Sequence, residues 1–267
     1  MHVNDYTSAI TTRTTGASPL PTSLGINHGN SSSARALNAY AGQDTSSVSN
    51  LARQLAASAT RASERDTGLS HSALGALARS LLDKITGAAY SANKAAHDKE
   101  VPATDDPELL ARAEQATAFV NATLTVGSKT VENPFAGLSR EQLALITYDD
   151  SGTFTVNERR AAFEETTRQE QAWRREVSDK AQQEYNTTGR MTDFFKQVQA
   201  HYNSLPAIEK AQYPADYAAQ VQQHIDADIN YKAQNAKDMI VPMTLAETLL
   251  TMGPVGSGKT LALPGAG

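Results

Sequence analysis

Cysteine is absent from this sequence of 267 residues, which excludes disulfide bonds, zinc sites with cysteine ligands and thiol catalysis. Long apolar runs are absent as well, so we expect no transmembrane segment. The start, MHVNDYTSAITTRTTG, lacks the basic region and apolar core of a secretory signal peptide. The first expectation is therefore a cytoplasmic location.

Positive charge is not in excess. The 24 Lys and Arg residues are outnumbered by 29 Asp and Glu residues, which gives a formal net charge of −5 at pH 7. A nucleic-acid-binding protein usually carries a basic patch, and a membrane-surface protein a cluster of Lys and Arg. The sequence shows neither feature, so we expect no nucleic acid among its partners.

Aromatic residues are few and unevenly placed. The sequence has 9 Tyr, 6 Phe and 1 Trp, and 11 of these 16 follow residue 147. The length allows one large domain or two modest ones. Because the large apolar side chains are concentrated late in the chain, we expect the main hydrophobic core in the second half.

Apolar residues recur at helical spacing through most of the chain, which predicts an all-α fold. The first part is different, since it is rich in Ser and Thr and shows no apolar period. The predicted order is a disordered leader over residues 1–44, a helical hairpin over 45–90, a linker over 91–105, a helical bundle over 106–237, and a short helix with a flexible tail over 238–267.

Local signals place three of the helices in the bundle. Asp106 is a good N-cap and Pro107 suits the first helical position, so a helix should begin there. Ser139 fits a capping box at the start of another helix. Residues 157–185 contain no Gly or Pro and predict one long helix. The apolar stripe of this helix is interrupted by Glu170, which the pattern leaves unexplained.

The stretch SREQLALITYDDSGTFTVNERR, residues 139–160, is the segment whose residue types suggest ion chemistry. Over residues 139–163 it resembles a single, degenerate EF-hand, through the letters DDSGTFTVNE. With Gly152 at the sharp turn, the resemblance implies calcium ligands at loop positions 1, 3, 5, 7, 9 and 12, which are Thr147, Asp149, Ser151, Thr153, Thr155 and Glu158. Thr147 stands where the family has Asp, and Ser151 is neutral, so we expect weak Ca²⁺ binding.

The same letters have an explanation without a metal. Asp and Ser side chains bond their own backbone in turns, and Gly152 accepts a positive φ without steric cost. Thr155 and Glu158 also fit a capping box, in which each side chain binds the backbone of the other. Both interpretations remain open on the sequence alone.

A second pattern suggests a nucleotide site. GPVGSGKT, residues 253–260, fits the phosphate-binding loop G-x-x-x-x-G-K-[ST]. Such a loop must follow a buried strand and open a helix, yet MTLAETLLTM precedes it and only LALPGAG follows. We therefore expect no nucleotide to bind here.

Two functions are compatible with these observations. The first is a non-enzymatic helical interaction protein that binds a protein partner and has a weak calcium-binding loop. The alternative is an exported bacterial effector or secretion accessory protein, because the Ser-rich, acid-poor leader resembles type III secretion signals in composition. This alternative implies secretion without a cleavable signal peptide. No nucleophile with a base and no complete cofactor motif is visible, so an enzyme is not expected.

Overall fold

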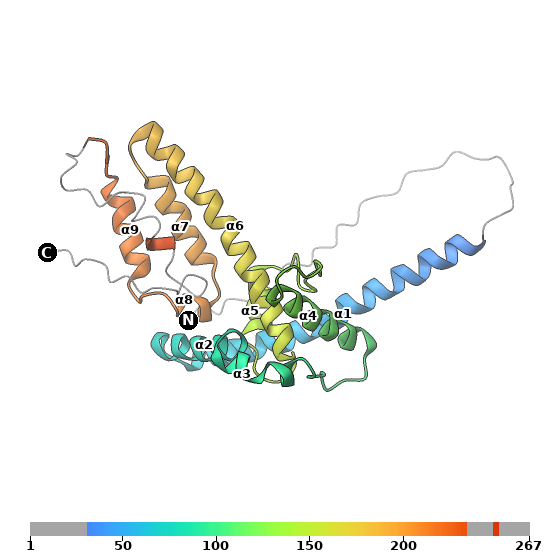
Figure 1. Cartoon of the computed structure of the whole chain (residues 1–267). Helices are drawn as coiled ribbons and strands as arrows, with labels where there is room; N and C mark the ends of the chain where they lie inside the picture. The colour runs from blue at the N-terminus through green and yellow to red at the C-terminus, as the bar shows by residue number, and fades with distance from the viewer. Residues whose placement is uncertain (1–30, 234–247, 251–267) are drawn as a thin grey trace, which may run out of the picture. The chain divides into compact units, whose positions relative to one another are not determined.

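The computed structural model describes residues 31–233 and 248–250 (Figure 1). Its contacts divide the chain into two units, residues 1–43 and 44–267. Of the first unit, the structure describes only the helical backbone of residues 31–43. All contacts reported below lie within the second unit.

The described residues form helices and contain no strand, which confirms the all-α prediction. In chain order, the helices are α1 (Ser31–Gly68), α2 (His71–Thr86), α3 (Ala88–His97), α4 (Pro107–Leu124), α5 (Arg140–Thr147), α6 (Val156–Thr188), α7 (Thr192–Ser204), α8 (Ala207–Lys210) and α9 (Tyr217–Ala227). No helix in the described ranges has an apolar stretch long enough to span a bilayer.

Several helices begin at the predicted capping residues. The Asp106 carboxylate accepts hydrogen bonds from the backbone amides of Glu108 and Leu109, and Pro107 follows it at the first helical position of α4. Ser139 and Gln142 form a reciprocal capping box at the start of α5. These ends are therefore specified locally by the sequence.

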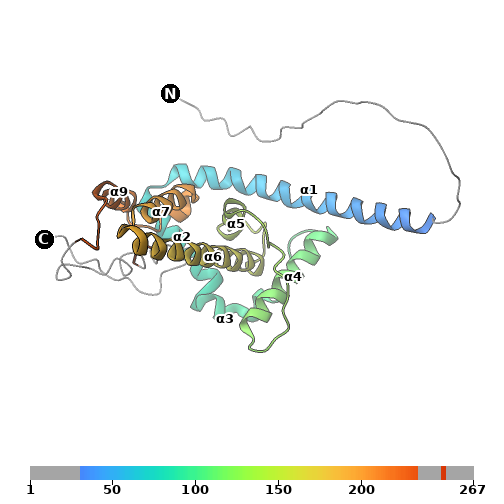
Figure 2. The same cartoon turned by 90° about the horizontal axis from the view of Figure 1, so that it is seen from above.

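Three clusters of buried side chains hold the helices together. One joins the C-terminal half of α6 to α7, α9 and the helical residues 248–250. A second joins α1, α3, α4 and α5 to the N-terminal half of α6, and a third places α2 against α8 and the end of α5. The long helix α6 takes part in all three clusters, and two views show α7 alongside it (Figure 1 and Figure 2).

The helices of the structure differ from the predicted divisions of the chain at three places. Helix α1 begins at Ser31, within the leader that the sequence predicts over residues 1–44. The predicted linker 91–105 is helical as far as His97, because α3 occupies its first part. The predicted hairpin of residues 45–90 also changes, since α2 packs mainly on α3, α6 and α8.

Other predictions fall partly or wholly outside the described residues. These are the leader over 1–30, the bundle after 233, the tail apart from 248–250, and the nucleotide pattern at 253–260. Within the described part, helices α4 to α9 occupy the range predicted for the bundle; α4, α5 and α7 contact α6, α9 contacts α7, and α8 contacts α2.

Candidate functional site

The acidic loop lies between α5, which ends at Thr147, and α6, which begins at Val156. Gly152 has a φ of 85°, in the left-handed region that glycine adopts without steric cost. Thr155 and Glu158 form the capping box of α6. The backbone of the loop therefore follows the turn and cap that the sequence specifies.

Asp149 is held by an arginine from a distant helix. Its Oδ2 accepts hydrogen bonds from Arg61 Nη2 and Ser58 Oγ of α1, and its Oδ1 accepts one from the Ser151 amide at 2.9 Å. Burial favours a higher pKa for Asp149, but the hydrogen bonds from Arg61, Ser151 and Ser58 outweigh it and lower the pKa to about 2. The carboxylate is ionised at neutral pH and neutralised by Arg61.

The Arg61 guanidinium also binds the middle of the loop. Its Nη2 donates to Thr153 Oγ1 at 3.0 Å, and Thr153 Oγ1 lies 2.8 Å from Ser151 Oγ. Three of the predicted ligands, Asp149, Ser151 and Thr153, thus form one hydrogen-bonded group with Arg61.

Glu158 is held by a different arginine. Its side chain is fully buried, and its Oε1 accepts a hydrogen bond from Arg112 Nε of α4 at 2.8 Å. Its Oε2 accepts from the Thr155 amide at 2.8 Å and lies 3.1 Å from Thr155 Oγ1. The guanidinium carbon of Arg112 lies 5.4 Å from the centre of the Phe154 ring. Thr155 and Glu158 therefore form a second hydrogen-bonded group, which includes Arg112.

Thr147, the remaining predicted ligand, contacts a third arginine. Arg159 Nε donates to the Thr147 carbonyl oxygen at 3.1 Å. Burial lowers the pKa of Arg159, while the charges of Asp150, Asp149 and Glu100 act in the opposite direction. The buried Thr147 Oγ1 and Arg159 Nη2 have no hydrogen-bond partner within the described residues.

As arranged, the six predicted ligands do not fit a calcium ion. Ca²⁺ needs roughly six to eight oxygen ligands around one point. Asp149 and Glu158 are directed to separate guanidinium groups, and an ion between them would have to displace Arg61 and Arg112. The described residues also contain no group of three or more His, Cys, Asp or Glu side chains placed to hold a metal. The arrangement favours the turn and capping box, and calcium binding stays a prediction.

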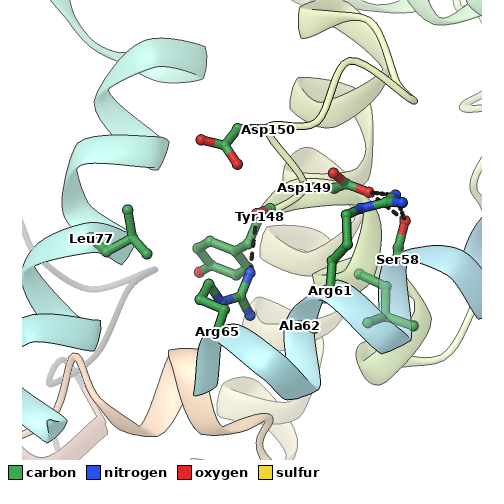
Figure 3. A pocket seen from close by; sticks show the side chains of 9 residues that line it. Ser58, Arg61, Ala62, Arg65, Leu77, Tyr148, Asp149 and Asp150 are labelled. Atoms are coloured by element: carbon green, nitrogen blue, oxygen red, sulfur yellow. Dashed lines mark hydrogen bonds and ion pairs between the residues drawn. The ribbon is translucent and has the colours of Figure 1, made fainter. Parts of the chain in front are cut away.

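A pocket of about 190 Å³ opens beside the loop (Figure 3). Its walls come from two helices and from the segment around the end of α5, namely Ser58, Arg61, Ala62 and Arg65 of α1, Leu77 of α2, and Leu145, Tyr148, Asp149 and Asp150. Arg65 donates from Nη1 to the Tyr148 carbonyl oxygen at 3.2 Å and from Nε to Asp66 at 2.8 Å. The pocket therefore combines apolar and charged lining residues.

A buried ionic network lies farther along α6. Arg140 of α5 donates to Glu170 at 2.9 Å and to Glu209 of α8 at 2.8 Å. Arg174 also donates to Glu170, at 3.1 Å, and His201 Nε2 lies 3.0 Å from the same carboxylate. Glu170, which interrupts the apolar stripe, thus joins α6 to α5 and α7.

The two carboxyl groups of the network have opposite pKa shifts. Burial favours a higher pKa for Glu170, but His201 and Arg140 outweigh it and lower the pKa to about 2. For Glu209, which is also fully buried, desolvation outweighs Arg140 and raises the pKa. Glu170 is therefore the more readily ionised of the two, because His201 as well as Arg140 stabilises its carboxylate.

The histidines of this region pack on aromatic rings. His201 stacks on Trp173 with the ring centroids 3.7 Å apart, and His224 stacks on Phe195 at 4.8 Å. Burial lowers the pKa of His224. Each histidine thus has a packing role, which gives no support to a shared metal site.

The arginines that complete the loop were not predicted from the sequence. A signal for them does exist, because Ser58, Arg61 and Arg65 follow one another at helical spacing and share one face of α1. No comparable local signal connects Arg112 with Glu158, which lies 46 residues later.

Comparisons with known proteins provide no further assignment. No family model matches the chain, and no curated protein or solved structure matches it either. The function must therefore be inferred from the geometry of the loop, the pocket and the ionic network.

Proposed function

We propose that this protein is a non-enzymatic helical interaction protein whose pocket beside the acidic loop receives part of a protein partner. The observation that carries this proposal is the size of the pocket, about 190 Å³. Sites for small-molecule ligands and cofactors usually measure about 300–1,000 Å³. A smaller pocket with apolar and charged lining residues suits a single side chain of another protein.

The way in which the loop is fixed also supports a binding role. Arg61 joins Asp149 and Thr153 to α1, and Arg112 joins Glu158 to α4. A binding surface held in one conformation loses little conformational entropy when a partner associates. Arg61 therefore holds one wall of the pocket in place, and calcium is not needed for this role.

The export alternative depends on residues 1–44. Within that range the structure describes only the helical backbone from Ser31 onward. A secretion role and a cytoplasmic location both stay predictions based on composition.

Filling the pocket should abolish partner binding. Ala62 lines the pocket, so Ala62→Arg places a long charged side chain in it. We expect the protein that the wild-type chain captures to bind Ala62→Arg at least about tenfold more weakly, a difference in binding free energy of about 1.4 kcal/mol. The measurement is affinity capture with quantitative mass spectrometry, followed by a direct binding assay with the purified partner.

Ala59→Arg is the matched control, because Ala59 is exposed one turn earlier on α1 and does not line the pocket. It should capture the same protein as the wild type. If every captured protein binds Ala62→Arg and Ala59→Arg equally well, the pocket is not the docking site.

A further inference from the structure

The charges around the pocket are unequally compensated. Arg61 is paired with Asp149, and Arg65 with Asp66 and the Tyr148 carbonyl oxygen. Asp150 is exposed and makes no hydrogen bond or ion pair with the described residues. Arg159 interacts with it only through space. Of the two carboxylates that line the pocket, Asp150 is therefore the one whose oxygens accept no hydrogen bond from the described residues.

The walls suit the stem of a long side chain. Ala62, Leu77, Leu145 and the Tyr148 ring supply apolar surface, and Figure 3 shows the Asp150 carboxylate beside the space between the loop and α2. Lys and Arg side chains bury their methylene groups against apolar surface while the charged end stays near water. A tyrosine ring can add a favourable cation–π contact.

We propose that the pocket receives a lysine or arginine side chain of the partner, with its charged end at Asp150. This inference rests on the proposed function and specifies the chemistry of the partner. An acidic side chain is disfavoured, because Asp149 and Asp150 line the pocket and the charges of Arg61 and Arg65 are each paired with a carboxylate. The buried Arg61 Nε has no hydrogen-bond partner within the described residues, and the glutamate probe described below tests this donor.

The chemistry of the pocket can be tested without the natural partner. The probes are blocked single residues, namely the N-acetyl N-methylamides of lysine, arginine, norleucine and glutamate. Each is titrated into the ¹⁵N-labelled full-length chain, and amide shifts are followed at residues 58–65, 77 and 145–150. The lysine and arginine probes should shift these amides at millimolar concentrations and bind more tightly than norleucine or glutamate.

The charged end is tested with Asp150→Asn. Because exposed ion pairs contribute about 0.2–1 kcal/mol, this variant should bind the basic probes about 1.4- to 5-fold more weakly. Asp105→Asn is the control, since Asp105 is exposed and does not line the pocket. It should leave the affinity unchanged.

Three results would overturn the inference. Equal binding of norleucine and lysine would show a purely apolar pocket, and stronger binding of glutamate would show an anion site at Arg61. No shift with any probe would show that the pocket recognises no single side chain. If the basic probes bind as expected but Ala62→Arg keeps every captured protein, then the proposed docking function fails while the chemistry of the pocket stands.

Discussion

Arg140→Met is expected to lower the free energy of unfolding by about 3–5 kcal/mol, because it leaves two buried carboxyl groups without their shared cation. Glu170 is 2 % exposed and Glu209 is 1 % exposed, so water cannot replace the lost hydrogen bonds. The measurement is urea unfolding at neutral pH, followed by circular dichroism. This large effect would show that the network fastens α5 and α8 to α6.

The control for Arg140→Met is Lys180→Met, which removes an exposed ion pair with Glu176 on the same helix, α6. This variant should lower the free energy of unfolding by less than about 0.5 kcal/mol. Adding Glu209→Gln to Arg140→Met removes one uncompensated charge and should recover part of the loss. If Arg140→Met costs no more than Lys180→Met, the network does not stabilise the fold.

Lowering the pH should reduce the difference in the free energy of unfolding between Arg140→Met and the wild type. Glu170 has a lower pKa in the folded chain, so its ionised form stabilises the wild type above the ordinary pKa of 4.5, and this contribution disappears as the pH falls toward about 2. Glu209 has a raised pKa, so its shift acts in the opposite direction: the cost of ionising it in the folded chain is removed by acid. In Arg140→Met, protonation would remove the negative charges of both carboxyl groups that have lost Arg140. The loss of free energy of unfolding in Arg140→Met should therefore become smaller below a pH of about 4.5.

Arg112→Met is expected to lower the free energy of unfolding by about 3 kcal/mol, since it leaves the fully buried Glu158 without its cation. It also removes the hydrogen bond from Arg112 to Gln54 of α1. Glu158→Gln should cost less, about 1–2 kcal/mol, because glutamine can still close the capping box. The two variants are compared by urea unfolding in a calcium-free buffer and in millimolar Ca²⁺.

Calcium distinguishes the two interpretations of Glu158. If Arg112 is its true partner, the order of the two variants is the same in both buffers. If Glu158 is an ion ligand, Ca²⁺ should stabilise Arg112→Met, in which the carboxylate is released, and have no effect on Glu158→Gln. The second pattern would contradict the assignment of Glu158 to Arg112.

The sequence predicted features that depend on neighbouring residues. The caps at Asp106, Ser139 and Thr155 follow from side chains within three residues of the amides they bind. The length of α6 follows in the same way from the absence of Gly and Pro over 157–185. For these features the local signal and the tertiary structure agree.

Features set by distant residues could not be predicted in this way. Residues 31–44 lack an apolar period, so nothing in the local pattern distinguished the start of α1 from a leader. Residues 88–97, AAYSANKAAH, offer Tyr90 as their one large apolar residue, although this side chain is buried in the core. Glu170 interrupts the apolar stripe of α6, and the local pattern did not indicate its partners on α5 and α7.

The candidate site shows the same division. The positive φ of Gly152 and the capping box of Thr155 and Glu158 are both present in the structure. Whether the carboxylates face an ion or a guanidinium depends on Arg61 and Arg112, which come from helices 88 and 46 residues away in sequence. A motif compares residue types within a segment and carries no information about such partners.

Thermal unfolding of the full-length chain in increasing Ca²⁺ tests most directly whether arginines hold the loop in place of a cation. Up to about 10 mM Ca²⁺, which exceeds the dissociation constants of weak extracellular calcium modules, the midpoint should not change. A ligand at 100 times its dissociation constant stabilises a fold by about 2.7 kcal/mol. A rise in the midpoint temperature that corresponds to such a stabilisation, and that is absent in Glu158→Gln, would contradict the assignment of Asp149 and Glu158 to Arg61 and Arg112.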